Sequence, residues 1–222
     1  MNIKISQSQH EFLQYHLKET FLMGSHLYGV ANESSDRDIL CVYKNPWADV
    51  FGLPMTHQFQ YDDEINNIDY IYCTEEQFWA NQRSGDSTIN SDIVLWAVSD
   101  LTRLERLELC RTYKVIKAYL GFANRDLKQA AKIGAHKVIH AQRGIYCAEE
   151  LLEGRIPLLS KIKTFYQSQE SVKDLQAKCA QIRENLNHAY DSDQIKSYWV
   201  PQVTDGLFQM LLNSNNTKEF KY

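Results

Sequence analysis

Hydrophobic and polar residues are patterned differently in the two halves of the chain. In the first half, residues 6–18 carry apolar side chains at helical spacing, which predicts a short amphipathic helix. Three apolar runs follow, at 21–23, 36–43 and 68–73, and each is rich in branched or aromatic residues between turn formers. That pattern is typical of strands. The stretch between the last two runs reads as a loop with one irregular strand around 56–61.

Helical spacing dominates from Thr74 onward. Thr74 is a candidate N-cap, and Gln77 stands where it would close a capping box. Gly154 and Pro157 indicate the end of the longest helix. The polar tail, 213–222, is expected to be loose. The predicted helices span 75–82, 91–98, 103–121, 125–153, 170–189 and 204–212.

These patterns predict an α+β protein. A small mixed β-sheet domain with flanking helices would occupy residues 1–100, and an all-helical domain would occupy 101–222. No linker rich in proline, glycine or serine marks the boundary. The chain has 222 residues, of which 44% are hydrophobic and 23% charged, and this composition favours folded domains over disorder.

Charge and cysteine usage narrow the functional classes. The net charge of −4 gives no overall positive field toward nucleic acid, although a local basic face is compatible with it. The sequence has no signal-peptide pattern and no apolar run long enough to span a membrane, so we expect a cytoplasmic protein. Its five cysteines are far apart and odd in number, which indicates free thiols rather than disulfides or a zinc site.

A glycine–serine pair follows the first predicted strand. Gly24 lets the backbone turn sharply and lets a ligand approach closely. If a helix begins at this turn, its free N–H groups and the Ser25 hydroxyl form a small anion site that suits a phosphate. Taken alone, the pair would be an ordinary strand-to-helix turn.

Three aspartates are the candidate metal ligands. Asp36 and Asp38 stand two apart at the start of the second strand, so their side chains share a face. Burying adjacent carboxylates without a partner is costly, and a divalent cation such as Mg²⁺ removes the conflict. Asp69 opens the third strand and joins them if that strand pairs beside the second, while the acids at 62–64 read as a solvated loop. Three carboxylates can hold two metal ions about 4 Å apart.

This order of residues resembles the nucleotidyltransferase superfamily that includes DNA polymerase beta. The chain carries G-S-x-x-Y-G from position 24, S-D-x-D from position 35, and then a strand aspartate. The resemblance implies that Gly24 and Ser25 bind the triphosphate of an NTP. It also implies that Asp36, Asp38 and Asp69 are catalytic and bind two Mg²⁺ ions, with Mn²⁺ able to substitute.

Two further features resemble a narrower group within that superfamily. The L-Y-G form of the loop at 27–29 is similar to a predicted bacterial and phage group linked to RNA repair. In that group a helical region with spaced lysine and arginine follows the catalytic domain, and a Gly-x-Ile-Pro-like turn comes next. Lys137, Arg143 and the G-R-I-P turn at 154–157 fit that order.

The predicted helix 125–153 also carries a basic stripe. On an otherwise acidic protein this stripe could face the triphosphate or a nucleic-acid strand, and either histidine in it could act as acid or base. The alternative is a solvated helix face. We select Lys137, His140 and Arg143 as candidate nucleotide-binding residues. At 100° per residue the stripe covers about 80° of one face and consists of Lys132, His136, His140 and Arg143, with Lys137 beside it.

Together these features predict a metal-dependent nucleotidyltransferase. An acceptor hydroxyl would attack the α-phosphorus of an NTP and release pyrophosphate, and the resemblance favours an RNA end as the acceptor. Two alternatives stay open: nucleotidylation (AMPylation) of a partner protein, and a non-catalytic nucleotide-sensing module. The presence of all three acids argues against the sensor. The sequence leaves the acceptor, the preferred base and the oligomeric state open.

Overall fold

The structure is a computed structural model that describes residues 3–33, 35–45, 58–85 and 87–198. The predicted helix at 204–212 and the tail after it lie outside the described residues. Of the helices in these four segments, none has both the length and the apolar character that crossing a membrane requires. The cytoplasmic location stays a prediction.

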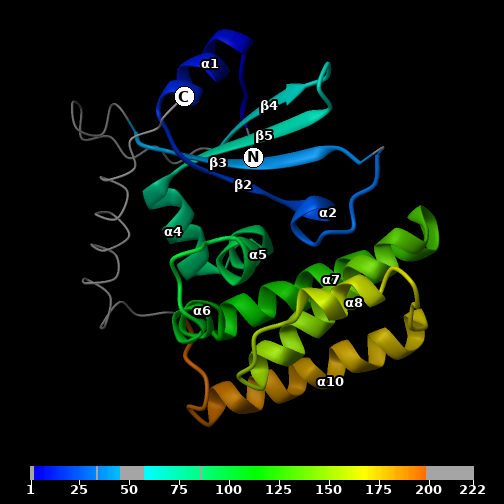
Figure 1. The fold of residues 1–222 in the computed structure, drawn as a ribbon. Helices are drawn as coiled ribbons and strands as arrows, with labels where there is room; N and C mark the ends of the chain where they lie inside the picture. The colour runs from blue at the N-terminus through cyan, green and yellow to red at the C-terminus, as the bar shows by residue number, and fades with distance from the viewer. Residues whose placement is uncertain (1–2, 34, 46–57, 86, 199–222) are drawn as a thin grey trace.

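A five-stranded mixed sheet lies at the centre of the first half (Figure 1). Its strands are β1 (Ile3–Lys4), β2 (Leu17–Leu22), β3 (Arg37–Tyr43), β4 (Phe59–Asp63) and β5 (Ile68–Thr74). They stand in the order β1-β4-β5-β3-β2. The β3–β5 and β1–β4 pairs are parallel, whereas the β4–β5 and β2–β3 pairs are antiparallel. This sheet, its flanking helices and the helical region after it confirm the predicted α+β class.

The second and third predicted strands are confirmed almost to the residue as β3 and β5. The first is longer than predicted, because β2 begins at Leu17, inside the stretch predicted as helix. The helix itself, α1 (Gln7–Tyr15), is shorter, and Ser6 caps it in a capping box with Gln9. The pairing of β2 with β3 outweighs the local helical spacing of Leu17.

The region predicted as a loop also contributes strand. β4 begins at Phe59, so the irregular strand predicted around 56–61 is partly confirmed, although its first two positions lie outside the described residues. Asp62 and Asp63 belong to β4 and not to a loop, which corrects the prediction for these two acids. β1 was not predicted, because two residues carry too little pattern to detect.

The two faces of the sheet are covered by different helices. α1 covers one face, where Leu13 packs against Tyr43 and Tyr72, and most other helices lie on the opposite face (Figure 1). Alternate side chains of β3 point to that opposite face, and Leu40 and Val42 belong to its large core. By the same alternation, Asp38 of β3 lies on the face of Leu40 and Val42, and Asp69 of β5 lies on the face of Ile71 and Cys73.

The helical region breaks at different places than predicted. The helix predicted at 103–121 is interrupted, because Thr112 accepts a hydrogen bond from the Val115 N–H and starts a new helix. The helix predicted at 125–153 is interrupted at Gly134, whose φ of 110° suits glycine. The helices are α6 (Arg103–Cys110), α7 (Tyr113–Ile133) and α8 (Ala135–Leu152).

The other helices follow the predictions more closely. The side chain of Thr74 caps α4 (Glu75–Ser84) by accepting a hydrogen bond from the Gln77 N–H, as predicted for the N-cap. A short helix after α8 was missed. These helices are α2 (Gly24–Leu27), α4 (Glu75–Ser84), α5 (Thr88–Trp96), α9 (Leu159–Thr164) and α10 (Val172–Asp191).

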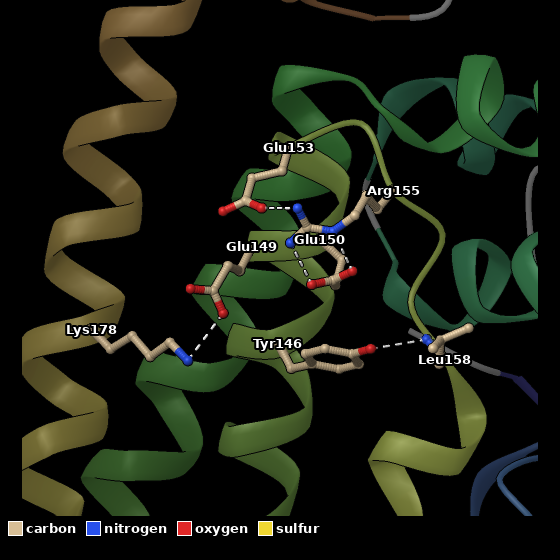
Figure 2. A network of polar contacts seen from close by, with 7 residues as sticks. All are labelled: Tyr146, Glu149, Glu150, Glu153, Arg155, Leu158 and Lys178. Carbon is tan, nitrogen blue, oxygen red and sulfur yellow. Dashed lines mark hydrogen bonds and ion pairs between the residues drawn. The ribbon is translucent and has the colours of Figure 1, made fainter.

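Polar contacts fix the chain where it leaves α8 (Figure 2). The helix ends before Gly154, as predicted, and the Arg155 guanidinium pairs with the carboxylates of Glu150 and Glu153. The Tyr146 hydroxyl accepts the Leu158 N–H at 3.0 Å, which ties the connection to α9 back onto α8.

One buried core runs through both predicted domains. It joins Met23 and Leu40 of the sheet region with Ile116, Ile145 and Leu175 of the helical region. The division at residue 100 stays a prediction, and the packing on either side of it is continuous.

Candidate active site

The three predicted aspartates lie together at the face of the sheet opposite α1. β3 and β5 are parallel neighbours, and the register places Asp38 opposite Asp69. Carboxylate oxygens of Asp36, Asp38 and Asp69, one from each residue, all lie within 4.8 Å of one another. The structure therefore brings together the three side chains that the sequence selected.

Burial and like charges both act on the acidic trio, Asp36, Asp38 and Asp69. Burial raises the pKa of the half-buried Asp38, and the charges of Asp36 and Asp69 raise it further. Burial also raises the pKa of Asp69, followed by the charges of Asp62 and Asp36. The charges of His26 and Lys4 only partly offset these increases. Three carboxylates that repel one another are a donor set that a divalent cation suits. The residues present thus fit a metal site.

The nearby acids of β4 are already engaged. Asp62 pairs with Asp69 in the register, but its carboxylate lies 2.6 Å from the Lys4 ammonium. Asp63 accepts hydrogen bonds from the N–H and the side-chain amide of Asn66. Asp69 is therefore the acid of this region that joins Asp36 and Asp38.

The glycine–serine turn lies directly beside Asp38. The Met23 N–H donates to the Asp38 carbonyl oxygen at 2.8 Å, which holds the end of β2 against β3. Gly24 has a φ of +56°, and a Cβ added there would lie 2.8 Å from Asp38 Oδ2. Glycine is required at this position both by the backbone conformation and by the close carboxylate. Ser25 follows on the single turn of α2.

A cavity of about 370 Å³ opens in front of this turn. Its wall on the sheet side includes Gly24, Ser25, Asp36 and Asp38, whereas Asp69 borders the other two acids from β5. Its wall on the helical side includes Tyr28, Asp92, Phe122, His140, Arg143 and Tyr166. The cavity joins predicted phosphate-binding, metal-binding and cationic residues from segments more than 100 positions apart in sequence.

Arg143 is the buried cation of the helical wall. It is 8% exposed, and its guanidinium lies 4.3 Å from the centre of the Tyr28 ring. Burial disfavours the charged form, but the acidic groups around it, Tyr28 and Asp92 foremost, raise the pKa of Arg143 above its ordinary value. The guanidinium remains charged where it lines the cavity.

The other two predicted nucleotide-binding residues surround a buried acid. His140 lines the cavity, and its Nδ1 lies 3.7 Å from a carboxylate oxygen of the fully buried Asp126. Burial, followed by the charge of Arg143, lowers the pKa of His140 to about 4, so the imidazole is neutral at pH 7. Lys137 pairs with the same Asp126 at 3.8 Å and is not among the residues lining the cavity. The nucleotide-binding roles of His140 and Lys137 stay predictions.

The basic stripe is shorter than predicted. His136 and His140 lie on α8 with Arg143, and their rings are 5.8 Å apart. The break at Gly134 places Lys132 on α7, so the helical phase that linked it to the stripe does not apply; its side chain lies outside the described part of the structure.

The sequence was compared with models of known protein families, and one of them matches most of the chain. The model of the RlaP family, described as the RNA repair pathway DNA polymerase beta family, matches residues 9–219. The chain belongs to this family. The predicted resemblance to the RNA-repair group is thereby confirmed, and membership supports a nucleotidyltransferase-type role. Among curated proteins, none matches the chain.

This member of the RNA repair pathway DNA polymerase beta family also carries site residues that sequence reasoning missed. Asp92 is fully buried and lines the cavity, where its carboxylate accepts hydrogen bonds from the hydroxyls of Tyr28 at 2.6 Å and Tyr119 at 2.5 Å. One signal could have identified Asp92: it is an acid followed by the apolar run I-V-L-W, where a charge needs a partner. Phe122 and Tyr166 carry no such signal.

Proposed function

We propose that the protein is a metal-dependent nucleotidyltransferase that moves a nucleoside monophosphate from an NTP to a hydroxyl at an RNA end. The observation that carries this proposal is that Asp36, Asp38, the Gly24–Ser25 turn and the Arg143 cation line one cavity, and that Asp69 lies beside the two cavity aspartates. The family description, which names an RNA repair pathway, supports RNA as the acceptor.

The two walls of the cavity would contact the triphosphate in different ways. Gly24 has no side chain, so a phosphate can approach the backbone closely, and the Ser25 hydroxyl can donate to it. Arg143 offers a fixed cation from the opposite wall, which favours polyphosphate over uncharged ligands. Catalysis of phosphoryl transfer consists mainly of such positioning and charge neutralisation.

In the proposed reaction the acceptor hydroxyl oxygen forms a bond to the α-phosphorus. The bond from that phosphorus to the oxygen bridging to the β-phosphate breaks, pyrophosphate leaves, and the hydroxyl proton passes to water. Asp36, Asp38 and Asp69 would hold one or two Mg²⁺ ions, with Mn²⁺ as a substitute. The bound cations would supply Lewis acidity, which lowers the pKa of the hydroxyl and neutralises phosphate charge.

A labelling experiment tests the proposal. The purified full-length chain is incubated with Mg²⁺ and each of the four NTPs labelled at the α-phosphate, with RNA or with a cell extract. We expect label on RNA with Mg²⁺ and none with EDTA. Label on protein would favour nucleotidylation of a partner, and NTP binding without transfer would favour a nucleotide sensor. Transfer at an unchanged rate by Asp38→Asn would contradict the metal assignment.

A further inference from the structure

The Arg143 guanidinium is buried but keeps its hydrogen-bonding capacity. Its Nε atom is buried and has no hydrogen-bond partner among the described residues. Within the same residues, its contacts are ring faces, with the Tyr28 ring centre at 4.3 Å and the Phe122 ring centre at 5.4 Å. A buried cation without acceptors is costly unless a ligand supplies them.

The nearest buried acid does not satisfy this cation. Asp92 lies close enough to Arg143 for their charges to interact, yet the two form neither an ion pair nor a hydrogen bond in the described structure. The two oxygens of Asp92 are occupied instead, Oδ2 by the Tyr28 hydroxyl and Oδ1 by the Tyr119 hydroxyl. Burial raises the pKa of Asp92, whereas the charge of Arg143 and the two hydroxyl hydrogen bonds act to lower it. Asp92 thus interacts with the charge of Arg143 without consuming its N–H groups.

Tyr28 connects the two parts of this arrangement. Its hydroxyl donates to Asp92, and its ring supports the guanidinium plane. Tyr28 is 3% exposed and packs at right angles against Trp96, so the ring has a fixed orientation. It also belongs to the G-S-x-x-Y-G segment and thereby links the glycine–serine turn to α5 and α8.

We propose that Tyr28 and Asp92 are positioning residues that hold Arg143 as an unpaired, preorganised cation for the polyphosphate of the nucleotide. The inference rests on the proposed function for the identity of the ligand. Preorganisation is the physical gain, because a guanidinium fixed by stacking loses little rotamer entropy when it binds an anion. Arg143 would contact the ligand directly, whereas Tyr28 and Asp92 would act through it.

Binding of inorganic tripolyphosphate in the presence of Mg²⁺ tests this without involving a base or an acceptor. Calorimetric titration of the full chain should show that Arg143→Met weakens binding about 10- to 100-fold, the loss expected for hydrogen bonds to a charged group. Arg125→Met is the matched control. Its guanidinium also lies over Phe122, at 4.9 Å, but it pairs with Asp126 and does not line the cavity. We expect less than about a threefold change for it.

A double-mutant cycle tests the positioning role. Tyr28→Phe keeps the ring and removes the hydroxyl, and it should weaken tripolyphosphate binding severalfold. In an Arg143→Met background the same change should have no further effect, because Tyr28 acts through Arg143. A purely structural role would lower the melting temperature in both backgrounds without this dependence. Asp92→Asn should follow the same pattern.

Three results would overturn the inference: no binding of tripolyphosphate by the wild type, equal losses in Arg143→Met and Arg125→Met, or a full Tyr28→Phe effect without Arg143. These outcomes are separable from failure of the proposed function. Binding that depends on Arg143, without label transfer to any acceptor, would defeat the transferase and leave this inference standing. Label transfer with unchanged binding in Arg143→Met would defeat this inference alone.

Discussion

Replacing Asp38 with asparagine should stabilise the metal-free protein while abolishing transfer. Asp38 is half-buried, and its carboxylate has an oxygen within 4.8 Å of oxygens of both Asp36 and Asp69. Burial and these two charges raise its pKa, so the charged form costs free energy in the folded state. Asparagine has nearly the same shape, and the substitution therefore removes a charge and little packing.

The size of the effect follows from the separation of the charges. Two unit charges 4.8 Å apart repel by about 0.9 kcal/mol at the dielectric constant of water and about 3.5 kcal/mol at an effective value of 20. Asp38 keeps part of its solvent contact and salt screens it, so the lower part of this range applies. We expect the free energy of unfolding to increase by about 1 kcal/mol. For a chain of this length that corresponds to about 2–4 °C in Tm.

The effect of pH has a definite sign. The folded-state pKa of Asp38 lies above its unfolded value, so the folded protein binds more protons between the two values. The contribution of Asp38 to wild-type stability should therefore rise as the pH falls through its folded pKa, and its penalty is fully present above that pKa. The advantage of the asparagine variant should be largest at pH 7 and shrink as the solution is acidified.

Scanning calorimetry in EDTA at several pH values measures this difference. Asp63→Asn is the control on the same sheet. Hydrogen bonds from Asn66 lower the pKa of Asp63 and stabilise its charged form, so the Asp63→Asn variant should be less stable than the wild type. Added Mg²⁺ should raise the Tm of the wild type and leave Asp38→Asn unchanged, since only a site with intact ligands gains from binding. A lower Tm for Asp38→Asn in EDTA at pH 7, or a gain that persists at low pH, would refute the electrostatic reasoning.

Three further predictions concern other parts of the fold. Gly24→Ala places a Cβ 2.8 Å from the Asp38 carboxylate at a positive φ. It should lower the free energy of urea unfolding by about 1–2 kcal/mol and the transfer rate about tenfold or more. As a control, Gly121→Ala in α7, where the added Cβ meets open space, should raise the free energy of unfolding by about 0.5–1 kcal/mol. The His140 imidazole should titrate in NMR spectra with a pKa of about 4. Because this pKa lies below the unfolded value, the contribution of His140 to stability is lost as the pH falls from about 6.5. An NMR midpoint near 6.5 would contradict the burial of the ring. Tyr146→Phe removes the hydroxyl that accepts the Leu158 N–H between α8 and α9 (Figure 2), and should lower the free energy of urea unfolding by about 1 kcal/mol. An unchanged unfolding midpoint would show that this hydrogen bond does not contribute to stability.

The acidic trio was predictable because its geometry follows from local rules. Side chains two residues apart on a strand point to the same face, and this rule places Asp36 and Asp38 side by side. Asp69 required one non-local assumption, that its strand pairs beside the second predicted strand, and the parallel β3–β5 register confirms this pairing. The Gly24 turn was equally readable, because few residues other than glycine adopt a positive φ.

The helical wall was less predictable, for reasons that are also physical. An apolar pattern continues through Thr112 and Gly134, and it does not indicate that one helix ends and the next begins at these residues. The positions of these breaks decide which residues face the cavity. Asp92 and Tyr119 are 27 positions apart, so their hydrogen bond depends on how α5 packs against α7. Helical periodicity predicts which face is buried, but it does not name the partner across the interface.

The net charge of −4 conceals a separation of charge across the cavity. The wall from the sheet carries Asp36 and Asp38, and by itself it would repel a triphosphate. The wall from α8 carries Arg143, whose charge is retained despite burial. Under the proposed function, a polyphosphate in this cavity would therefore face cations from both sides, one supplied by the chain and the others held by the carboxylates. This arrangement would reconcile an acidic protein with the proposed anionic substrate, because the sign of the field is set within the cavity, where a low dielectric constant strengthens near charges over distant ones.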